Sequence, residues 1–264
     1  MKNNKLLQIT DISGYLESPD SNEAVEYCHE SSTFLSGQFE YPVIAGIPML
    51  FLQRFLPHLG ERCLDVPFGH YEDPILQYGL LSSIKQGHDY PNSPHDSPAY
   101  HEHVEHMRCL LRDVHGSVLD IGCDSPTMSA SFLPDNVRYI GLDPIYGSNT
   151  EFKIGGMAEF LPFRTDAFDN VLLISNLDHI LDYHRAIDEA GRALRPGGSL
   201  FVQCLMWTER AEVYYDHLHF HHFREEQFMM AFTDDFELCE FQRHPWKGDT
   251  HRSSVYIKFV RRQD

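Results

Sequence analysis

The chain has 264 residues, enough for one or two domains with a substantial buried core. Its 42% hydrophobic and 23% charged residues are typical of a soluble globular protein. No run of eighteen apolar residues occurs, and the N-terminus lacks the apolar core of a signal peptide, so we expect neither a membrane span nor export. The formal net charge of −18 argues against nucleic acid as the main ligand.

The cysteine and histidine contents point to a reduced, pH-sensitive protein. Six cysteines are scattered without a CxxC pair: Cys28, Cys63, Cys109, Cys123, Cys204 and Cys239. Zinc sites and disulfide frameworks need closer grouping, so we expect reduced thiols and a cytoplasmic location. Protonation of all 17 histidines would change the net charge from −18 to −1, mostly between about pH 5 and 7.

The chain divides into three parts by composition. Residues 1–53 form a predicted small N-terminal module that ends in the apolar segment 41–51, where Pro42, Gly46 and Pro48 indicate a bent, extended element. Residues 54–96 are rich in proline, glycine, histidine and aspartate, which predicts a connector with short helices. Residues 97–264 form the predicted main domain.

Strands and helices alternate from Ser97 onward. We expect helices over 97–114, 183–194 and 223–232, the first with Ser97 as its N-cap. We expect strands over 118–122, 137–143, 168–175, 199–206, 236–243 and 253–260. This alternation predicts an α/β fold with a mostly parallel sheet and a ligand at the carboxyl ends of its strands.

The first two of these strands end in residues suited to a nucleoside. Asp120 and Gly122 close the first strand in the sequence VLDIGC, where a glycine turn lets a ligand approach the backbone. Asp143 ends the second strand, and one carboxylate can accept hydrogen bonds from both hydroxyls of a ribose. Each feature alone is weak evidence for a cofactor site.

The order of the motifs resembles the class I S-adenosylmethionine (SAM) methyltransferases, in the group of the ubiquinone/menaquinone-type enzymes. The matching stretches are VLDIGC (118–123), YIGLDP (139–144), AEFLPF (158–163), FDNVLLISNLDHILD (168–182) and RALRPGGSLFV (192–202). The resemblance implies a Rossmann-like, mostly parallel seven-stranded sheet with helices on both faces, accompanied here by the small N-terminal module. It also implies SAM as the cofactor.

The same resemblance implies where the cofactor lies. The loop at Asp120 and Gly122 would lie under the methionine part, Asp143 would bind the ribose, and residues 157–159 would line the adenine. Asn176 to His179 would close the pocket between cofactor and acceptor. The implied cofactor-binding residues are Asp120, Gly122, Cys123, Asp143, Pro144, Met157, Ala158, Glu159 and Asn176.

Two positions depart from the family pattern. The usual loop is Asp-x-Gly-x-Gly-x-Gly, but this chain has Asp124 and Pro126 in place of the second and third glycines. Met157 stands where an acidic residue is usual. A catalytically inactive relative that binds a ligand or a partner therefore stays open as an alternative. A dinucleotide oxidoreductase is disfavoured because no Gly-x-Gly-x-x-Gly follows the first strand.

The N-terminal module has a resemblance of its own. Residues 41–51 resemble the closing strand of the small zinc-ribbon domain of the tRNA-methyltransferase activator. The paired cysteines of that family are absent: Ser18-Pro19-Asp20 stands near the place of one pair, and Cys28 is alone. Four zinc ligands cannot be assembled from these residues, so we expect the shape of the ribbon without zinc.

Two groups of histidines need separate interpretations. His103 and His106 have neither the HExxH nor the HxxEH spacing of metalloproteases, and we expect them on a solvated helix face. Residues 217–222 follow the fifth strand, and catalytic, metal-binding and structural roles stay open for them. If this segment is extended, His217, His219 and His221 point the same way. We assign no metal ligands and name His179 and His219 as candidate catalytic bases.

Together these features predict a SAM-dependent methyltransferase that acts on a small-molecule acceptor, with O- or N-methylation expected. Neither nucleic acid nor a membrane is an expected partner. The oligomeric state, including a homodimer, is left open.

Overall fold

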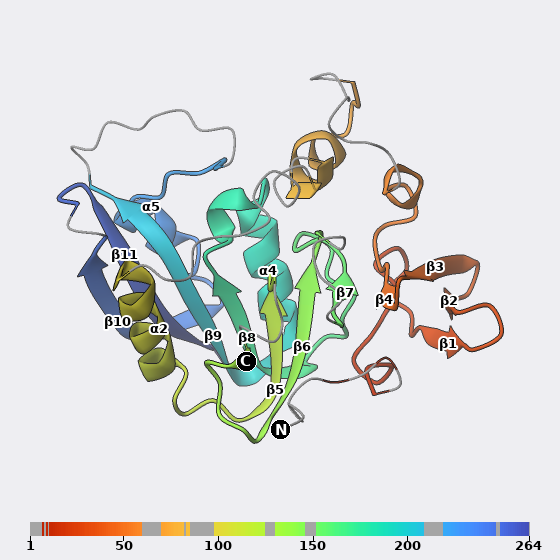
Figure 1. The fold of residues 1–264 in the computed structure, drawn as a ribbon, viewed down its shortest axis with the longest axis horizontal. Coiled ribbons are helices and arrows are strands. Elements are labelled where there is room, and N and C mark those ends of the chain that lie inside the picture. Colours follow the sequence, from red (N-terminus) through yellow and green to blue (C-terminus); the bar gives the residue numbers. More distant parts are fainter. Residues whose placement is uncertain are drawn as a thin grey trace.

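The computed structural model describes Leu7, Ile9 and residues 11–59, 70–81, 83–84, 98–124, 130–145, 152–208, 219–246 and 249–263 (Figure 1). The expected N-cap Ser97 lies outside these residues, as do Cys63, Pro126 and His217. Within the described part of the chain, no helix has the length and apolar character needed to cross a bilayer.

A seven-stranded, mostly parallel sheet forms the centre of the molecule. Its strands are β5 (Gly116–Ile121), β6 (Val137–Asp143), β7 (Ile154–Gly155), β8 (Phe168–Ile174), β9 (Leu194–Trp207), β10 (Phe236–Pro245) and β11 (Arg252–Arg261). The spatial order is β10-β11-β9-β8-β5-β6-β7. Strands β9, β8, β5, β6 and β7 run parallel, and β11 is antiparallel to both of its neighbours. The predicted fold class is therefore confirmed.

Helices cover both faces of this sheet. Helix α2 (Pro98–Leu110) packs Met107 and Leu110 on one face, in a cluster that contains Val118 and Phe201 of the sheet. On the opposite face, helix α4 (Tyr183–Ala193) packs against the neighbouring strand residues in a second cluster, together with the short helix α5 (Glu225–Met230). Successive strand residues enter opposite clusters because side chains alternate along a strand.

The N-terminal module is a four-stranded antiparallel sheet, shown in red and orange in Figure 1. It consists of β1 (Glu26–Cys28), β2 (Thr33–Ser36), β3 (Phe39–Ile44) and β4 (Ile47–Pro48). The expected single bent element over 41–51 is thus parts of two strands joined by a hairpin. Its turn residues, Ala45 and Gly46, have φ values of +52° and +84°, as a tight turn between twisted strands requires.

Hydrogen bonds close the module near the position where the ribbon family has one cysteine pair. The Tyr41 hydroxyl donates to Asp20 Oδ2 at 2.8 Å and lies 2.6 Å from Ser18 Oγ. The backbone N–H of Gln53 also donates to the Asp20 carboxylate, at 3.1 Å. Burial raises the pKa of Tyr41, so its hydroxyl keeps the proton that it donates. These polar contacts join the start, middle and end of the module.

The module packs directly against the large sheet. Met49 forms a parallel bridge with Gly155 of β7, and the Leu50 N–H donates to the Gly155 carbonyl at 2.8 Å. Arg192 of α4 donates to Glu17 at 2.7 Å, and apolar residues of module and sheet belong to one core cluster. Because the module and the sheet share one core, the domain boundaries at 53/54 and 96/97 stay a prediction.

The described residues of the segment that follows the module include two short helices. A 3₁₀ helix, η1, spans Leu56–His58, and a π-helix, η3, spans Ile75–Leu80. Their apolar residues share a core cluster with Met49, Phe51 and Met157. The described part of the connector therefore packs between the module and the loop after β7.

The prediction that His103 and His106 lie on a solvated helix face is wrong. His103 Nδ1 lies 3.1 Å from the Tyr256 hydroxyl, and the His106 ring stacks on His244 with centroids 3.5 Å apart. Tyr256 and His244 project from β11 and β10 toward α2, so flat rings fill this contact in place of aliphatic side chains. Burial lowers the pKa of His103 to about 4 and also lowers the pKa of His244.

This contact predicts a loss of stability in mild acid. An unfolded histidine titrates near pH 6.5, so below that pH the unfolded chain binds more protons than the folded one, and stability falls between about pH 6.5 and 4. We expect His103→Phe to reduce this fall by on the order of 1–3 kcal/mol in urea unfolding at pH 7 and pH 4.5. The exposed His115 gives the control His115→Phe, which should keep the wild-type pH dependence. An unchanged pH dependence in His103→Phe would contradict the assignment.

Candidate functional site

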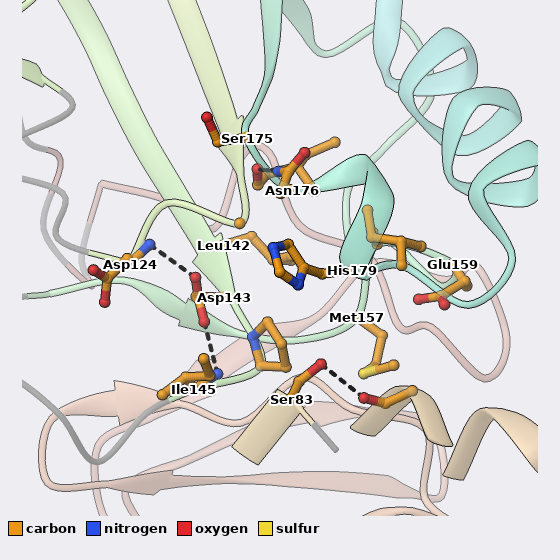
Figure 2. A pocket seen from close by; sticks show the side chains of 16 residues that line it. Ser83, Asp124, Leu142, Asp143, Ile145, Met157, Glu159, Ser175, Asn176 and His179 are labelled. Carbon is orange, nitrogen blue, oxygen red and sulfur yellow. Dashed lines mark hydrogen bonds between the residues drawn. The ribbon is translucent and has the colours of Figure 1, made fainter. Parts of the chain in front are cut away.

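A pocket of about 730 Å³, part of it open to solvent, lies at the carboxyl ends of β5, β6 and β8 (Figure 2). The predicted site residues that line it are Gly122, Asp143, Pro144, Met157, Ala158, Glu159, Asn176 and His179. The pocket is also lined by residues that were not predicted as site residues: Gly79, Ser83, Ile121, Leu142, Ile145, Ser175 and Ile180. Asp124, named above as a departure from the family loop, lines it too.

The loop after β5 can be formed only with glycine at position 122. Gly122 has a φ of +71°, and a Cβ atom there would lie 2.4 Å from Asn176 Nδ2. The N–H groups of Gly122 and Cys123 both donate to the Leu142 carbonyl, at 2.7 and 3.2 Å. Asp124, in place of the second family glycine, also has a positive φ, +43°. The loop therefore keeps a glycine-type backbone at a residue that is not glycine.

Asp143 is held in place by backbone groups from two loops. Its carboxylate accepts from the Asp124 N–H at 2.8 Å and from the Ile145 N–H at 2.7 Å (Figure 2). The fully buried Lys153 donates from Nζ to the Asp124 carbonyl at 2.8 Å. Burial raises the pKa of Asp143, while Lys153 and the two N–H groups oppose that shift. An ionised carboxylate has about four acceptor positions, so Asp143 can bind a ligand as well.

The loop after β7 and the connector together form one wall of the pocket. Gly79 of η3 lies against Met157, since a Cβ atom at Gly79 would be 3.2 Å from Met157 Cε. Glu159 is 1% exposed, and its Oε1 accepts from the Asp182 N–H at 3.5 Å. Burial raises the pKa of Glu159 to about 7. This wall is therefore mostly apolar, with one carboxyl group that is easily protonated.

Asp120 and Cys123 do not line the pocket. Asp120 is 2% exposed and accepts a hydrogen bond of 2.6 Å from the Tyr139 hydroxyl. The Cys123 thiol is also buried, and burial raises its pKa. Both residues support the loop at Gly122 from inside the fold, and their contact with a cofactor stays a prediction.

Asn176 brings an unsatisfied polar atom to the pocket wall. Its Nδ2 donates to the Ile121 carbonyl, which ties the end of β8 to the end of β5. Its Oδ1 is buried and has no hydrogen-bond partner among the described residues. A buried acceptor without a donor costs about 1–3 kcal/mol, which a ligand N–H or O–H can offset.

The structure brings the two candidate bases together around Asp178. The rings of His179 and His219 have centroids 4.5 Å apart. Asp178 Oδ1 lies 3.8 Å from His179 Nε2, and Oδ2 lies 3.9 Å from His219 Nε2. His179 lines the pocket, and His219 lies behind it. Residues 178 and 219 are far apart in the sequence, which is why sequence reasoning did not connect them.

His219 and His221 do not point the same way. His221 Nε2 lies 2.9 Å from the Ile180 carbonyl, away from the rings of His179 and His219. The segment is not extended, because the N–H of Phe220 donates to the Asp178 carbonyl at 2.8 Å and bends the chain around it. The shared direction was expected only for an extended segment, and this condition is not met for the two histidines that the structure describes.

Comparisons with known proteins agree with this architecture. Residues 100–240 match the model of a methyltransferase domain family. A ubiquinone/menaquinone biosynthesis C-methyltransferase of Hahella chejuensis is 35% identical over 95 residues, covering 36% of this chain and 32% of that protein. A ubiquinone biosynthesis O-methyltransferase of Xanthomonas oryzae is 27% identical over 107 residues, covering 36% of this chain and 45% of that protein. The chain thus spans less than half the length of these relatives.

A solved structure shares most of the fold. The 1,6-didemethyltoxoflavin N1-methyltransferase of Burkholderia thailandensis superposes with a TM-score of 0.58 over 87% of this chain and 98% of that one, at 15% identity. That enzyme was solved with 1,6-didemethyltoxoflavin and S-adenosylhomocysteine bound. At this identity the likeness shows the fold alone.

The raised pKa of Glu159 predicts a pH-dependent effect of its substitution. A folded-state pKa near 7, against 4.5 ordinarily, means that the stability this group contributes is lost as the pH rises from about 4.5 to 7. We expect Glu159→Gln to raise the free energy of unfolding at pH 8 by on the order of 1–3 kcal/mol and to change it little at pH 5. Urea unfolding at both pH values, with the exposed Glu226→Gln as control, measures this difference. Equal effects at the two pH values would show that Glu159 ionises normally.

Proposed function

This chain belongs to the class I methyltransferase family, and we propose that it transfers a methyl group from SAM to an oxygen or nitrogen atom of a small molecule. The observation that carries the proposal is the buried Asp143 carboxylate beside the glycine turn at Gly122, at the adjacent carboxyl ends of β6 and β5. A strand-end carboxylate next to a close backbone approach suits a ribose and its attached groups.

The acceptor groups of the pocket suit the charge of SAM, and its apolar wall suits the adenine ring. Asp143 is available to the ribose hydroxyls, and the apolar wall at Gly79 and Met157 suits an adenine ring. The unsatisfied Asn176 Oδ1 can face the amino-acid part of the ligand. The acidic side chains of the lining complement the positive sulfonium and ammonium groups of SAM.

Bound in this pocket, SAM would supply an electrophilic methyl group. The chain contributes position, because an in-line displacement depends mainly on holding the acceptor atom opposite the leaving sulfur. Asn176, His179 and Ile180 line the pocket, and the His179 side chain is 31% exposed, so we place the acceptor beside His179. We place His179, with His219 behind it, to take the proton that a hydroxyl or amine acceptor releases.

A small-molecule acceptor is supported by the concave site and by the charge of the chain. The net charge of −18 disfavours a polyanionic nucleic-acid acceptor. The three methyltransferases compared above are named for methylation at carbon, oxygen and nitrogen respectively. The acceptor chemistry must therefore be argued from the side chains of this chain.

One observation favours a second candidate, an inactive relative that binds a ligand without methyl transfer. Met157 stands in the pocket wall where an acidic residue is usual in the family, which removes a hydrogen-bond acceptor for the adenine amino group. Calorimetric titration with SAM distinguishes the two candidates. No binding at millimolar SAM would favour the inactive relative.

Asp143 and Asp124 give a matched pair of variants. We expect Asp143→Ala to weaken SAM binding by about 2–4 kcal/mol, roughly thirty- to a thousand-fold, because charged hydrogen bonds to the ribose are lost. Asp124→Gly should leave the affinity unchanged or increase it, since glycine adopts the positive φ of this position without strain. Isothermal calorimetry on both variants and the wild type measures the effect.

The contacts of Asp143 show that its substitution also needs a control for folding. Asp143 faces the buried Lys153 and accepts two backbone hydrogen bonds, so alanine should also lower the melting temperature. Asp143→Asn keeps the shape of the side chain, and circular dichroism establishes folding for each variant. Normal SAM affinity in folded Asp143→Ala and Asp143→Asn would show that the ribose binds elsewhere.

A further inference from the structure

Two segments that lie 40 residues apart in the sequence meet beside the pocket and bring together an aspartate and two histidines, residue types that can ligate a metal. Asp178 and His179 belong to the 3₁₀ helix η4 (Leu177–His179), and His219 enters from the chain between β9 and α5. One ligand atom from each residue lies within 4.8 Å of the others. In the described part of the chain, this is the only group of three or more such side chains with that spacing.

The separations agree with ligands that share one ion. The Asp178 carboxylate oxygens lie 3.8 Å from His179 Nε2 and 3.9 Å from His219 Nε2. Two ligands of a tetrahedral ion with bonds near 2.1 Å are about 3.4 Å apart, so small side-chain rotations would close the site. Two imidazole nitrogens and one carboxylate oxygen form a donor set used by Zn²⁺ and other divalent transition metals.

The surroundings of Asp178 are a second observation in favour of a cation. The Asp178 side chain is 13% exposed, and its Oδ1 is buried with no hydrogen-bond partner among the described residues. A buried carboxylate oxygen without a donor is costly, and a cation between Asp178 and the two imidazoles removes that cost.

Hydrogen bonds outside the cluster hold its two segments beside each other. The Asp178 carbonyl accepts from the Phe220 N–H at 2.8 Å, which places His219 beside Asp178. On the other side of the turn, the His221 ring lies 2.9 Å from the Ile180 carbonyl. Outer contacts of this kind orient metal ligands in advance of binding.

We propose that Asp178, His179 and His219 bind one divalent transition-metal ion at the edge of the pocket. Three protein ligands leave a coordination position open, as in catalytic rather than structural zinc sites. The two histidines are 31% and 32% exposed, and His179 lines the pocket, so the open position can take an oxygen of an acceptor molecule. With both imidazoles on the ion, the metal would take over from His179 in promoting loss of the acceptor's proton. This last step rests on the proposed function, whereas metal binding itself does not. The acceptor class that fits is a molecule with a metal-binding hydroxyl, such as a catechol.

Metal titrations of the full chain, purified without a histidine tag and treated with chelator, test the site. We expect Zn²⁺ to bind at one ion per chain by calorimetry, and Co²⁺ to give the visible absorption of a site with nitrogen and oxygen ligands. Asp178→Asn, His179→Ala and His219→Ala should each weaken binding at least roughly ten- to a hundred-fold. His222→Ala, in the same histidine-rich segment but outside the cluster, should bind as the wild type does.

The outcomes separate the metal site from the proposed function. SAM binding that persists in Asp178→Asn, together with loss of metal binding, supports two neighbouring sites. If no metal binds, or if the cluster variants bind it as well as His222→Ala does, the inference is overturned even when SAM binds normally. Catechol should change the Co²⁺ spectrum of the wild type, and an unchanged spectrum would overturn the open coordination position.

Discussion

A buried carboxylate at the end of β6 organises the ligand pocket. Asp143 is 3% exposed, and a charge at that depth must be compensated by hydrogen bonds or by an opposite charge. The Asp124 N–H, the Ile145 N–H and the buried Lys153 provide this compensation. They come from the loop after β5, the loop after β6 and the segment before β7. The need to stabilise one carboxylate therefore fixes three chain segments around the cavity before any ligand arrives.

The connector forms one wall of the pocket that lies at the strand ends of the large sheet. The family of folds to which this sheet belongs presents its strand ends as an open edge, and here η3 packs against that edge through Gly79 and Met157. Ser83 donates from its hydroxyl to the Gly79 carbonyl at 2.7 Å, which continues this wall. The site thus depends on residues before the methyltransferase domain as well as on the domain itself.

The buried strands could be predicted closely because their patterns are local. The strand over 137–143 has its expected bounds, since an apolar run ends at a charged residue that faces the cavity. Strand β9 begins earlier than expected, at Leu194 rather than Ser199, because Leu194 pairs with Phe168 across a register shift. Such pairing depends on a partner strand 26 residues away and leaves no local signal.

The site was predictable where it follows the family motifs and not where distant segments meet. Residues 157–159 lie in the pocket wall as expected, since they belong to one recognisable stretch. Lys153 was missed, although a lysine between Phe152 and Ile154 is an available signal for a buried cation. His103 was misassigned because its exposure is decided by rings on β10 and β11, not by the helix sequence. The grouping of Asp178 with His219 likewise required the fold.

The docking of the N-terminal module has a consequence for self-association. Strand β7 is only two residues long, and Met49 and Leu50 occupy the pairing positions along its outer edge. At the opposite edge of the sheet, β10 carries an irregularity between Leu238 and Glu240 together with charged side chains. Exposed, regular edge strands are templates for pairing between molecules, and bulges, charges and covering segments prevent it. The module therefore protects the β6–β7 side from fibril-like aggregation, and a fragment that lacked it would expose that edge to other chains.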